Sequence, residues 1–286
     1  MSSLARVSEL LKTCGLANVS NAILESVRPC ILLDTSSTQM DAMAIGQSRI
    51  GGIPDLPADF EWPSYKNEPL SFIAQVNLSE LGPYEAAKEL PDSGNLAFFY
   101  DSQQYVWGFD PNDALGFRVI HFKGDDLERR DFPNGLPEQS RFKPLELKFA
   151  QDLSLAPWDS CSINRLNLSD RQSDDYVELL EKFEATERGS IQSFLLGHPD
   201  QIQGNMQLEC ALVTNGINCG ASPGYSDPRA ETFKKEADSW RLLLQVFSED
   251  GAGMMWGDLG CLYFWIREDD LKAGNFDRVW TILQCG

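Results

Sequence analysis

The chain has little positive charge: 24 lysines and arginines stand against 43 aspartates and glutamates, a formal net charge of −19 over 286 residues. A field of this sign repels nucleic-acid phosphates and anionic membranes, so the sequence predicts neither as a partner. The same field attracts cations and basic proteins. A basic protein is therefore the partner that the charge favours, although a high net charge also simply keeps a protein soluble.

Histidine is almost absent, since His121 and His198 are the two in the chain. A histidine-rich metal site and the H-E-x-x-H zinc helix are therefore excluded. The seven cysteines include no C-x-x-C pair, which removes zinc ribbons and thioredoxin-like redox motifs. The sequence predicts no metal and no cofactor, and it indicates reduced, buried thiols in a cytoplasmic protein.

Long apolar runs are also lacking. No stretch approaches the roughly 18 apolar residues of a membrane span, and Lys12 interrupts the longest apolar stretch near the start, where a signal peptide would have its core. Hydrophobic residues still make up 42% of the chain, which suits a soluble globular protein with a substantial core.

Four short landmarks occur twice in the same order, which indicates an internal duplication. They are a Gly-x-Pro-Asp turn (52–55 and 197–200), an apolar run ending in Gln-Val (72–76 and 242–246), a glycine before alternating apolar residues (94–98 and 260–264) and Arg-Val (118–119 and 278–279). The second copy has an insertion over roughly 203–238 between its turn and its Gln-Val run. We expect residues 70–123 and 240–286 to form strand sets of the same number and direction.

The repeated segments have the apolar and aromatic composition of strands. The sequence therefore predicts a mainly β (α+β) fold: roll-like or packed antiparallel sheets from two internally duplicated lobes, with flanking helices. The amphipathic stretches that predict helices are 3–13, 20–28, 173–187 and 229–238.

No linker-like or charged block divides the chain, so we expect one compact domain. Its expected parts are an N-terminal helical segment and strand (1–45), a first β repeat (46–123), a connecting segment with a helix (124–190) and a second β repeat (191–286).

At these landmarks the sequence resembles the YwqG-like family, a bacterial family. The stretches that carry the resemblance are GGIPDLPADFEWP, PLSFIAQVNLSEL, LPDSGNLAFFYD, LLGHPDQIQG, WRLLLQVFSEDGAGMMWGDLGCLYFWIREDDL and FDRVWTILQC, within residues 46–286. The resemblance implies a mainly β, roll-like fold with helices on its flanks, and it implies no reaction. Some members of such families look like immunity partners of secreted toxins, which suggests the capture of a basic toxin.

Three stretches resemble fragments of catalytic or cofactor motifs, and each lacks its partners. Asp34-Thr35-Ser36 has no second aspartic-protease motif, and Ser140 to Lys143 has no accompanying β-lactamase elements. The glycine-rich stretch 251–257 does not have the G-x-G-x-x-G spacing of a dinucleotide site. The sequence therefore names no catalytic residue.

The loop from Glu249 to Gly260 is the strongest local candidate for a binding site. Met255 and Trp256 are too apolar for an ordinary solvent loop, and Asp258 supplies an acceptor. Together these residues could bind a basic side chain, a sugar or a cation in a concavity where the two copies meet. The alternative is a structural turn in which Trp256 fills the core.

Two pairs of residues are equivalent by the repeat: Asp55 with Asp200, and Gln75 with Gln245. If the aspartates converge on a pseudo-two-fold axis, they could perform acid/base work or bind Ca²⁺. Otherwise they are turn residues. The glutamines either bind a ligand or satisfy buried backbone groups.

The sequence favours a binding protein without catalysis, acting on a protein or a small molecule. The alternative is a carboxylate-based enzyme such as a carbohydrate-active hydrolase, which needs two carboxyl groups about 5 Å or about 6.5–9.5 Å apart. That alternative loses its basis if Asp55, Asp200 and Asp258 lie on separate surfaces.

Overall fold

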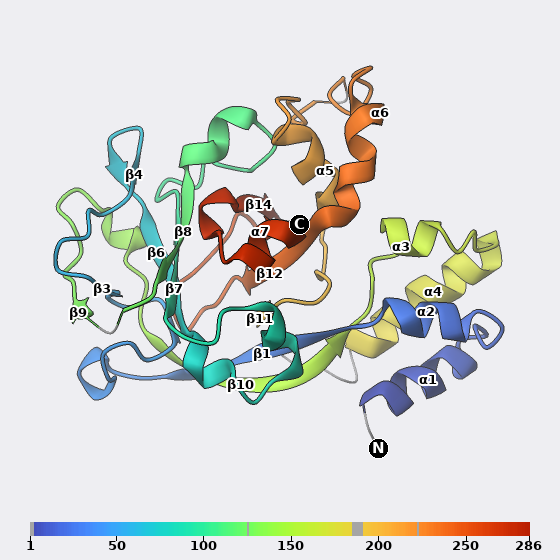
Figure 1. Cartoon of the computed structure of the whole chain (residues 1–286), viewed down its shortest axis with the longest axis horizontal. Coiled ribbons are helices and arrows are strands. Elements are labelled where there is room, and N and C mark those ends of the chain that lie inside the picture. Colours follow the sequence, from blue (N-terminus) through green and yellow to red (C-terminus); the bar gives the residue numbers. More distant parts are fainter. Residues whose placement is uncertain (1–2, 125, 185–190, 222) are drawn as a thin grey trace.

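A computed structural model gives the fold and describes residues 3–124, 126–184, 191–221 and 223–286 (Figure 1). The predicted mainly β fold with flanking helices is confirmed, and it takes the form of one nearly closed antiparallel sheet. The strands, in their order across the sheet, are β14 (Trp280–Gln284), β13 (Cys261–Arg267), β12 (Trp240–Phe247), β11 (Phe194–Leu195), β1 (Arg28–Ser37), β10 (Leu145–Ser154), β2 (Arg49–Ile50), β6 (Ser71–Asn77), β7 (Asn95–Tyr100) and β8 (Phe117–Phe122).

Two small two-stranded sheets and the helices surround this sheet. The small sheets pair β3 (Asp55–Leu56) with β9 (Glu128–Arg129) and β4 (Ser64–Tyr65) with β5 (Glu68–Pro69). The α-helices are α1 (Ser3–Thr13), α2 (Ser20–Ser26), α3 (Cys161–Asn164), α4 (Asp170–Phe183), α5 (Met206–Val213), α6 (Ala230–Phe233) and α7 (Glu268–Ala273). The 3₁₀-helices are η1 (Met40–Ala42), η2 (Leu78–Leu81), η3 (Glu85–Glu89), η4 (Pro111–Leu115), η5 (Glu138–Ser140), η7 (Lys234–Ser239) and η8 (Phe276–Arg278).

Helices α1 to α4 gather at one end of the molecule, away from α5 and α6 (Figure 1). They share an apolar cluster that includes Val7, Leu11, Tyr176 and Leu179. Helix α4 begins before the predicted start at 173, because Ser169 forms a capping box with Gln172. The end of that prediction, from 185 onward, lies outside the described residues. The predicted helix at 229–238 is divided between α6 and η7, and the predictions do not include α3, α5 and α7.

The two halves of the sheet have the same construction. Strands β6, β7 and β8 pair antiparallel in sequence order, and so do β12, β13 and β14, so the two strand sets agree in number and direction. The β6–β7 register shifts between Phe72 and Ala74, and the β12–β13 register shifts between Leu242 and Leu244. Matching irregularities at matching positions support the predicted duplication, which stays an inference.

The Arg-Val landmark does not occupy equivalent positions in the two halves. Phe99 pairs with Arg118 across β7 and β8, and Trp265 pairs with Trp280 across β13 and β14. Because Phe99 and Trp265 are equivalent, Arg118 corresponds to Trp280 and not to Arg278. The two Arg-Val dipeptides are therefore a coincidence of sequence.

The centre of the sheet is the pair β1 and β10, which face each other from Arg28 opposite Ser154 to Ser37 opposite Leu145. Strand β1 also pairs with β11 of the second half, and β10 also pairs with β2 of the first half, both antiparallel. Strand β10 was not predicted, because the segment 124–190 was expected to connect the repeats through a helix.

Equivalent aromatic residues from the two halves meet inside the curved sheet. The rings of Phe98 on β7 and Phe264 on β13 are 5.2 Å apart between centroids, in an edge-to-face arrangement. Strands β7 and β13 are buried on both faces along nearly their whole length. In the part of the chain that the structure describes, no helix is long and apolar enough to cross a membrane.

Candidate functional site

The loop from Glu249 to Gly260 is closed over the core. Trp256 is 1% exposed, and its ring packs edge-on against Tyr100 and Phe142, with centroids 5.9 Å and 5.5 Å away. Its backbone N–H donates to the Ser248 hydroxyl at 2.9 Å, which holds the loop down. The expectation that Trp256 lines a concavity is therefore wrong, and the alternative, a turn in which it fills the core, is what the structure contains.

The neighbours of Trp256 face outward. Met255 is 41% exposed, and Asp258 is exposed on the same loop. The Asp258 backbone carbonyl accepts a hydrogen bond from the N–H of Gly286. These two side chains therefore belong to the surface and share no cavity with Trp256.

Gln75 and Gln245 perform the same local task in each half. The Gln75 side-chain oxygen accepts the N–H of Asp55 at 3.0 Å, and the Gln245 oxygen accepts the N–H of Asp200 at the same distance. Each amide nitrogen donates to a backbone carbonyl and lies 3.3 Å from the aspartate carboxylate. Both glutamines thus satisfy backbone groups of a Pro-Asp turn. This is one of the two roles that the sequence predicted for them.

The structure does not bring Asp55 and Asp200 together. Ala74 lies opposite Phe98, whose ring points into the interior, so Gln75, the next residue, points to the outer face. Gln245 follows Leu244 opposite Phe264 in the same way. The two Gln–Asp pairs therefore lie on the outer face in different halves of the sheet.

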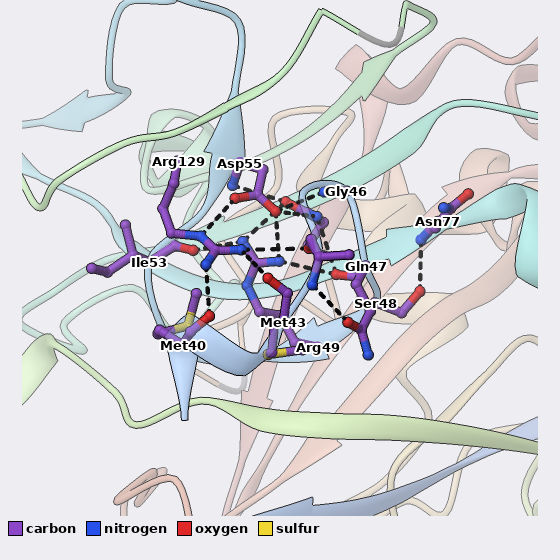
Figure 2. A network of polar contacts seen from close by, with 12 residues as sticks. Met40, Met43, Gly46, Gln47, Ser48, Arg49, Ile53, Asp55, Asn77 and Arg129 are labelled. Atoms are coloured by element: carbon purple, nitrogen blue, oxygen red, sulfur yellow. Dashed lines mark hydrogen bonds and ion pairs between the residues drawn. The ribbon is translucent and has the colours of Figure 1, made fainter. Parts of the chain in front are cut away.

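Asp55 is enclosed in a network of ion pairs (Figure 2). Its carboxylate is 2.9 Å from Arg49 Nη1 and 3.1 Å from Arg129 Nε, and both Asp55 and Arg49 have fully buried side chains. Arg129 also donates to the carbonyls of Met40 and Met43. Burial alone would raise the pKa of the Asp55 carboxyl, but the charge and hydrogen bond of Arg49 hold that pKa below its ordinary value.

This network ties β2, β3 and β9 to the segment before β2, and no solvent reaches its centre. Asp200, by contrast, lines a separate pocket of about 340 Å³ beside Trp158 and Asp159. The three candidate carboxylates are therefore a buried ion pair, a pocket residue and a surface residue. The hydrolase alternative loses the carboxylate pair on which it rested.

A second cavity, of about 520 Å³, lies where the first half of the molecule meets the insertion of the second half. We call it the α5 pocket, because α5 forms one of its walls. Among the residues that line it are Trp107, Phe109, Leu208, Glu209, Cys219 and Tyr225. It lies at the junction of the two halves, but it contains none of the residues of the Glu249–Gly260 loop for which a concavity was expected.

The first-half side of the α5 pocket follows the outer edge of β14. The N–H of Leu283 donates to the carbonyl of Trp107 at 3.1 Å, and the Trp280 indole donates to the carbonyl of Gly108 at 2.8 Å. Gly108 has φ +89°, and a Cβ there would lie 2.2 Å from the carbonyl oxygen of Thr281. Glycine is required at this position so that the segment can approach the strand and present Trp107 and Phe109 to the pocket.

The insertion side is fixed by two amide side chains. The Gln284 oxygen on β14 accepts the N–H groups of Ile202 and Gln203, both at 2.9 Å. Asn205 then caps α5 by accepting the N–H of Leu208 at 3.1 Å. These bonds set the direction of α5 and place Glu209, in its first turn, at the pocket.

Glu209 has an unusual electrostatic environment. Burial among apolar neighbours raises the pKa of its carboxyl to about 7, and a hydrogen bond from the Tyr225 hydroxyl at 3.4 Å opposes that rise only weakly. Burial also raises the pKa of the nearby Cys219 to about 12, so that group is a thiol and not a nucleophilic thiolate at neutral pH. Among the described residues that line this pocket, Glu209 is therefore the group that changes charge near neutral pH.

One feature of the sequence does point to this site. The segment 206–213, MQLECALV, is apolar except for Gln207 and Glu209, and a lone carboxylate in such a segment is uncommon. It lies inside the insertion that interrupts the repeat, which is where the two halves differ. Its pocket partners, Trp107 and Phe109, are far away in the sequence and gave no local sign.

In the described residues, no group of three or more histidine, cysteine, aspartate or glutamate side chains could hold a metal ion.

No curated protein sequence matches the chain. Residues 48–285 match a family described as a domain of unknown function, DUF1963, and nothing in that match conflicts with the YwqG-like resemblance, which stays a prediction. The match spans most of the chain and both halves of the sheet, so the protein belongs to the DUF1963 family.

Proposed function

We propose that this protein is a binding protein and that its ligand occupies the α5 pocket. The observation that carries the proposal is the position of this pocket. The two halves of the sheet repeat the same strands and the same Gln–Asp bonds, and the insertion with α5 is a departure from that repeat. Because this insertion adds a cavity to a framework that is otherwise repeated, we place the function of the protein at that cavity.

The size and lining of the pocket support the same proposal. A volume of about 520 Å³ lies within the roughly 300–1,000 Å³ of small-molecule sites. Apolar and aromatic walls with a few polar groups are also typical of such sites. Leu208, Ile282 and Leu283 supply apolar surface, and Gln203 supplies an exposed amide at the edge.

Capture of a basic protein remains a prediction from the net charge of −19, and an immunity-like role remains a prediction from the family resemblance. The enzyme alternative has less support. At the α5 pocket a two-carboxylate hydrolase would need a second carboxyl group close to Glu209, and Glu209 is the one acidic residue among the described residues that line this pocket.

A fragment screen read by NMR on the Trp107 indole N–H tests the proposal. Wild-type protein should give fragments that shift this resonance. Gln203→Trp, which places an indole at the pocket edge, should abolish most of these shifts. Gln103→Trp is the matched control, since Gln103 is exposed and outside the pocket, and it should leave them unchanged.

The proposal is contradicted if no fragment shifts Trp107, or if the shifts are the same in Gln203→Trp and in wild type. Thermal unfolding of both variants verifies that neither substitution has altered the fold.

A further inference from the structure

The described lining of the α5 pocket has an acidic side chain and no basic one. Glu209 lines it, and none of its lining residues in the described part of the chain is a lysine, an arginine or a histidine. The described structure gives the Glu209 carboxylate one hydrogen-bond donor, the neutral hydroxyl of Tyr225. A carboxylate that loses water contacts without gaining a cation is costly, because its charge is left uncompensated.

Asp55, a fully buried carboxylate elsewhere in this molecule, has two cations beside it. Asp55 lies between Arg49 and Arg129, at 2.9 Å and 3.1 Å. The contrast shows that the fold can place arginine beside a buried acid, and that it does not do so at Glu209. A ligand with a positive charge would supply the counter-charge that the described chain does not place beside Glu209.

Aromatic side chains line the same pocket as Glu209. Trp107, Phe109 and Tyr225 all line the pocket, and Phe109 and Tyr225 are 36% and 43% exposed. The ring of Phe109 is held against the backbone of Gly220, where a Cβ would come within 2.6 Å of it. Ring faces attract cations through their quadrupole, most strongly in tryptophan, and so favour alkylated or planar organic cations over a hydrated metal ion.

From these contacts we propose that the α5 pocket selects a compact organic cation, of the quaternary ammonium or guanidinium class, which pairs with Glu209 against Trp107, Phe109 and Tyr225. This inference rests on the proposed function and names the ligand class of the same site. The cation is either a free small molecule or the basic side chain of a partner protein. Both sources present the same chemistry to the pocket.

Isothermal titration calorimetry at a pH near 8, where Glu209 is ionised, separates the contribution of the ligand's charge to the affinity from that of its shape. The probes are choline and its neutral isostere 3,3-dimethylbutan-1-ol, which fill similar volumes. Choline should bind about 10-fold or more tightly than the isostere, since it adds the ion pair and the ring contacts. Equal affinity of the two probes would overturn the cation inference and leave the proposed function standing, whereas a failed fragment screen removes both.

Glu209→Gln tests the residue itself, because it keeps the shape of the side chain and removes its charge. It should weaken choline binding about 10-fold or more and leave the affinity for the isostere unchanged. Glu231→Gln is the matched control: it makes the same change in net charge at an 80% exposed side chain outside the pocket, and it should have little effect. Equal losses in the two variants would overturn the assignment of Glu209.

Two further probes distinguish the sources of the cation. If acetyl-Gly-Arg-Gly-amide binds more tightly than methylguanidinium, the pocket takes an arginine side chain of a partner. If methylguanidinium or choline binds as tightly as the peptide or more tightly, the ligand is a free small molecule. Either result supports a cation, and binding of none of the cationic probes overturns it.

Discussion

Trp256→Ala is expected to lower the free energy of unfolding by about 3–5 kcal/mol, the usual cost of removing a large buried aromatic side chain. Trp256 is 1% exposed and packs between Tyr100 and Phe142, so truncation leaves a cavity that these rings cannot fill without moving. Urea unfolding measures the change.

Met255→Ala is the matched control, because Met255 is the next residue and is 41% exposed; its effect should be within about 1 kcal/mol. Choline binding by folded Trp256→Ala protein should equal that of wild type. A variant with normal stability and lost binding would show that this loop is a site after all.

Asp55→Asn is expected to lower the free energy of unfolding by about 3–5 kcal/mol near neutral pH, because it leaves the buried guanidinium of Arg49 without its counter-charge. The double variant Arg49→Met with Asp55→Asn should lose less than Asp55→Asn alone, since both buried charges are then gone and Arg129, which is 23% exposed, can turn to water. Urea unfolding of the two variants and of Arg49→Met completes the cycle. Additive losses would contradict the pairing.

The effect of Asp55→Asn should depend on pH in a defined direction. The pKa of Asp55 is lower in the folded protein than in the unfolded chain, so its contribution is present above the unfolded pKa and is lost as the pH falls through the folded pKa. The difference in stability between wild type and Asp55→Asn should therefore shrink in acid. A difference that grows in acid would mean that the network does not stabilise the ionised carboxylate.

The repeated strands could be predicted because their signals are local. The run around Gln75 and the run around Gln245 are apolar, short and bounded by turns, and both are buried strands in the sheet. Strand β10 gave no such signal, because six of its ten residues are not buried and its stability comes from pairing with β1 along its length. Pairing between strands so distant in sequence leaves little trace in either one.

The candidate site was less accessible to prediction. Whether Trp256 is a surface or a core residue depends on Tyr100 and Phe142, which no local pattern connects to it. The equivalence of Gln75 and Gln245 was visible in the sequence, but their role depends on the hydrogen bonds that the folded turns offer. Sequence equivalence therefore identified shared structural parts, whereas the pocket arises where the halves differ.

The most direct measurement of the central claim is the titration of the Glu209 carboxyl, followed by its side-chain ¹³C resonance with and without saturating choline. Without ligand, Glu209 should titrate with a pKa of about 7, because burial disfavours its charged form. Bound choline should lower that pKa, since a neighbouring cation stabilises the carboxylate. An ordinary glutamate pKa in the free protein, or a raised pKa that choline leaves unchanged, would contradict the assignment of the α5 pocket as a cation site.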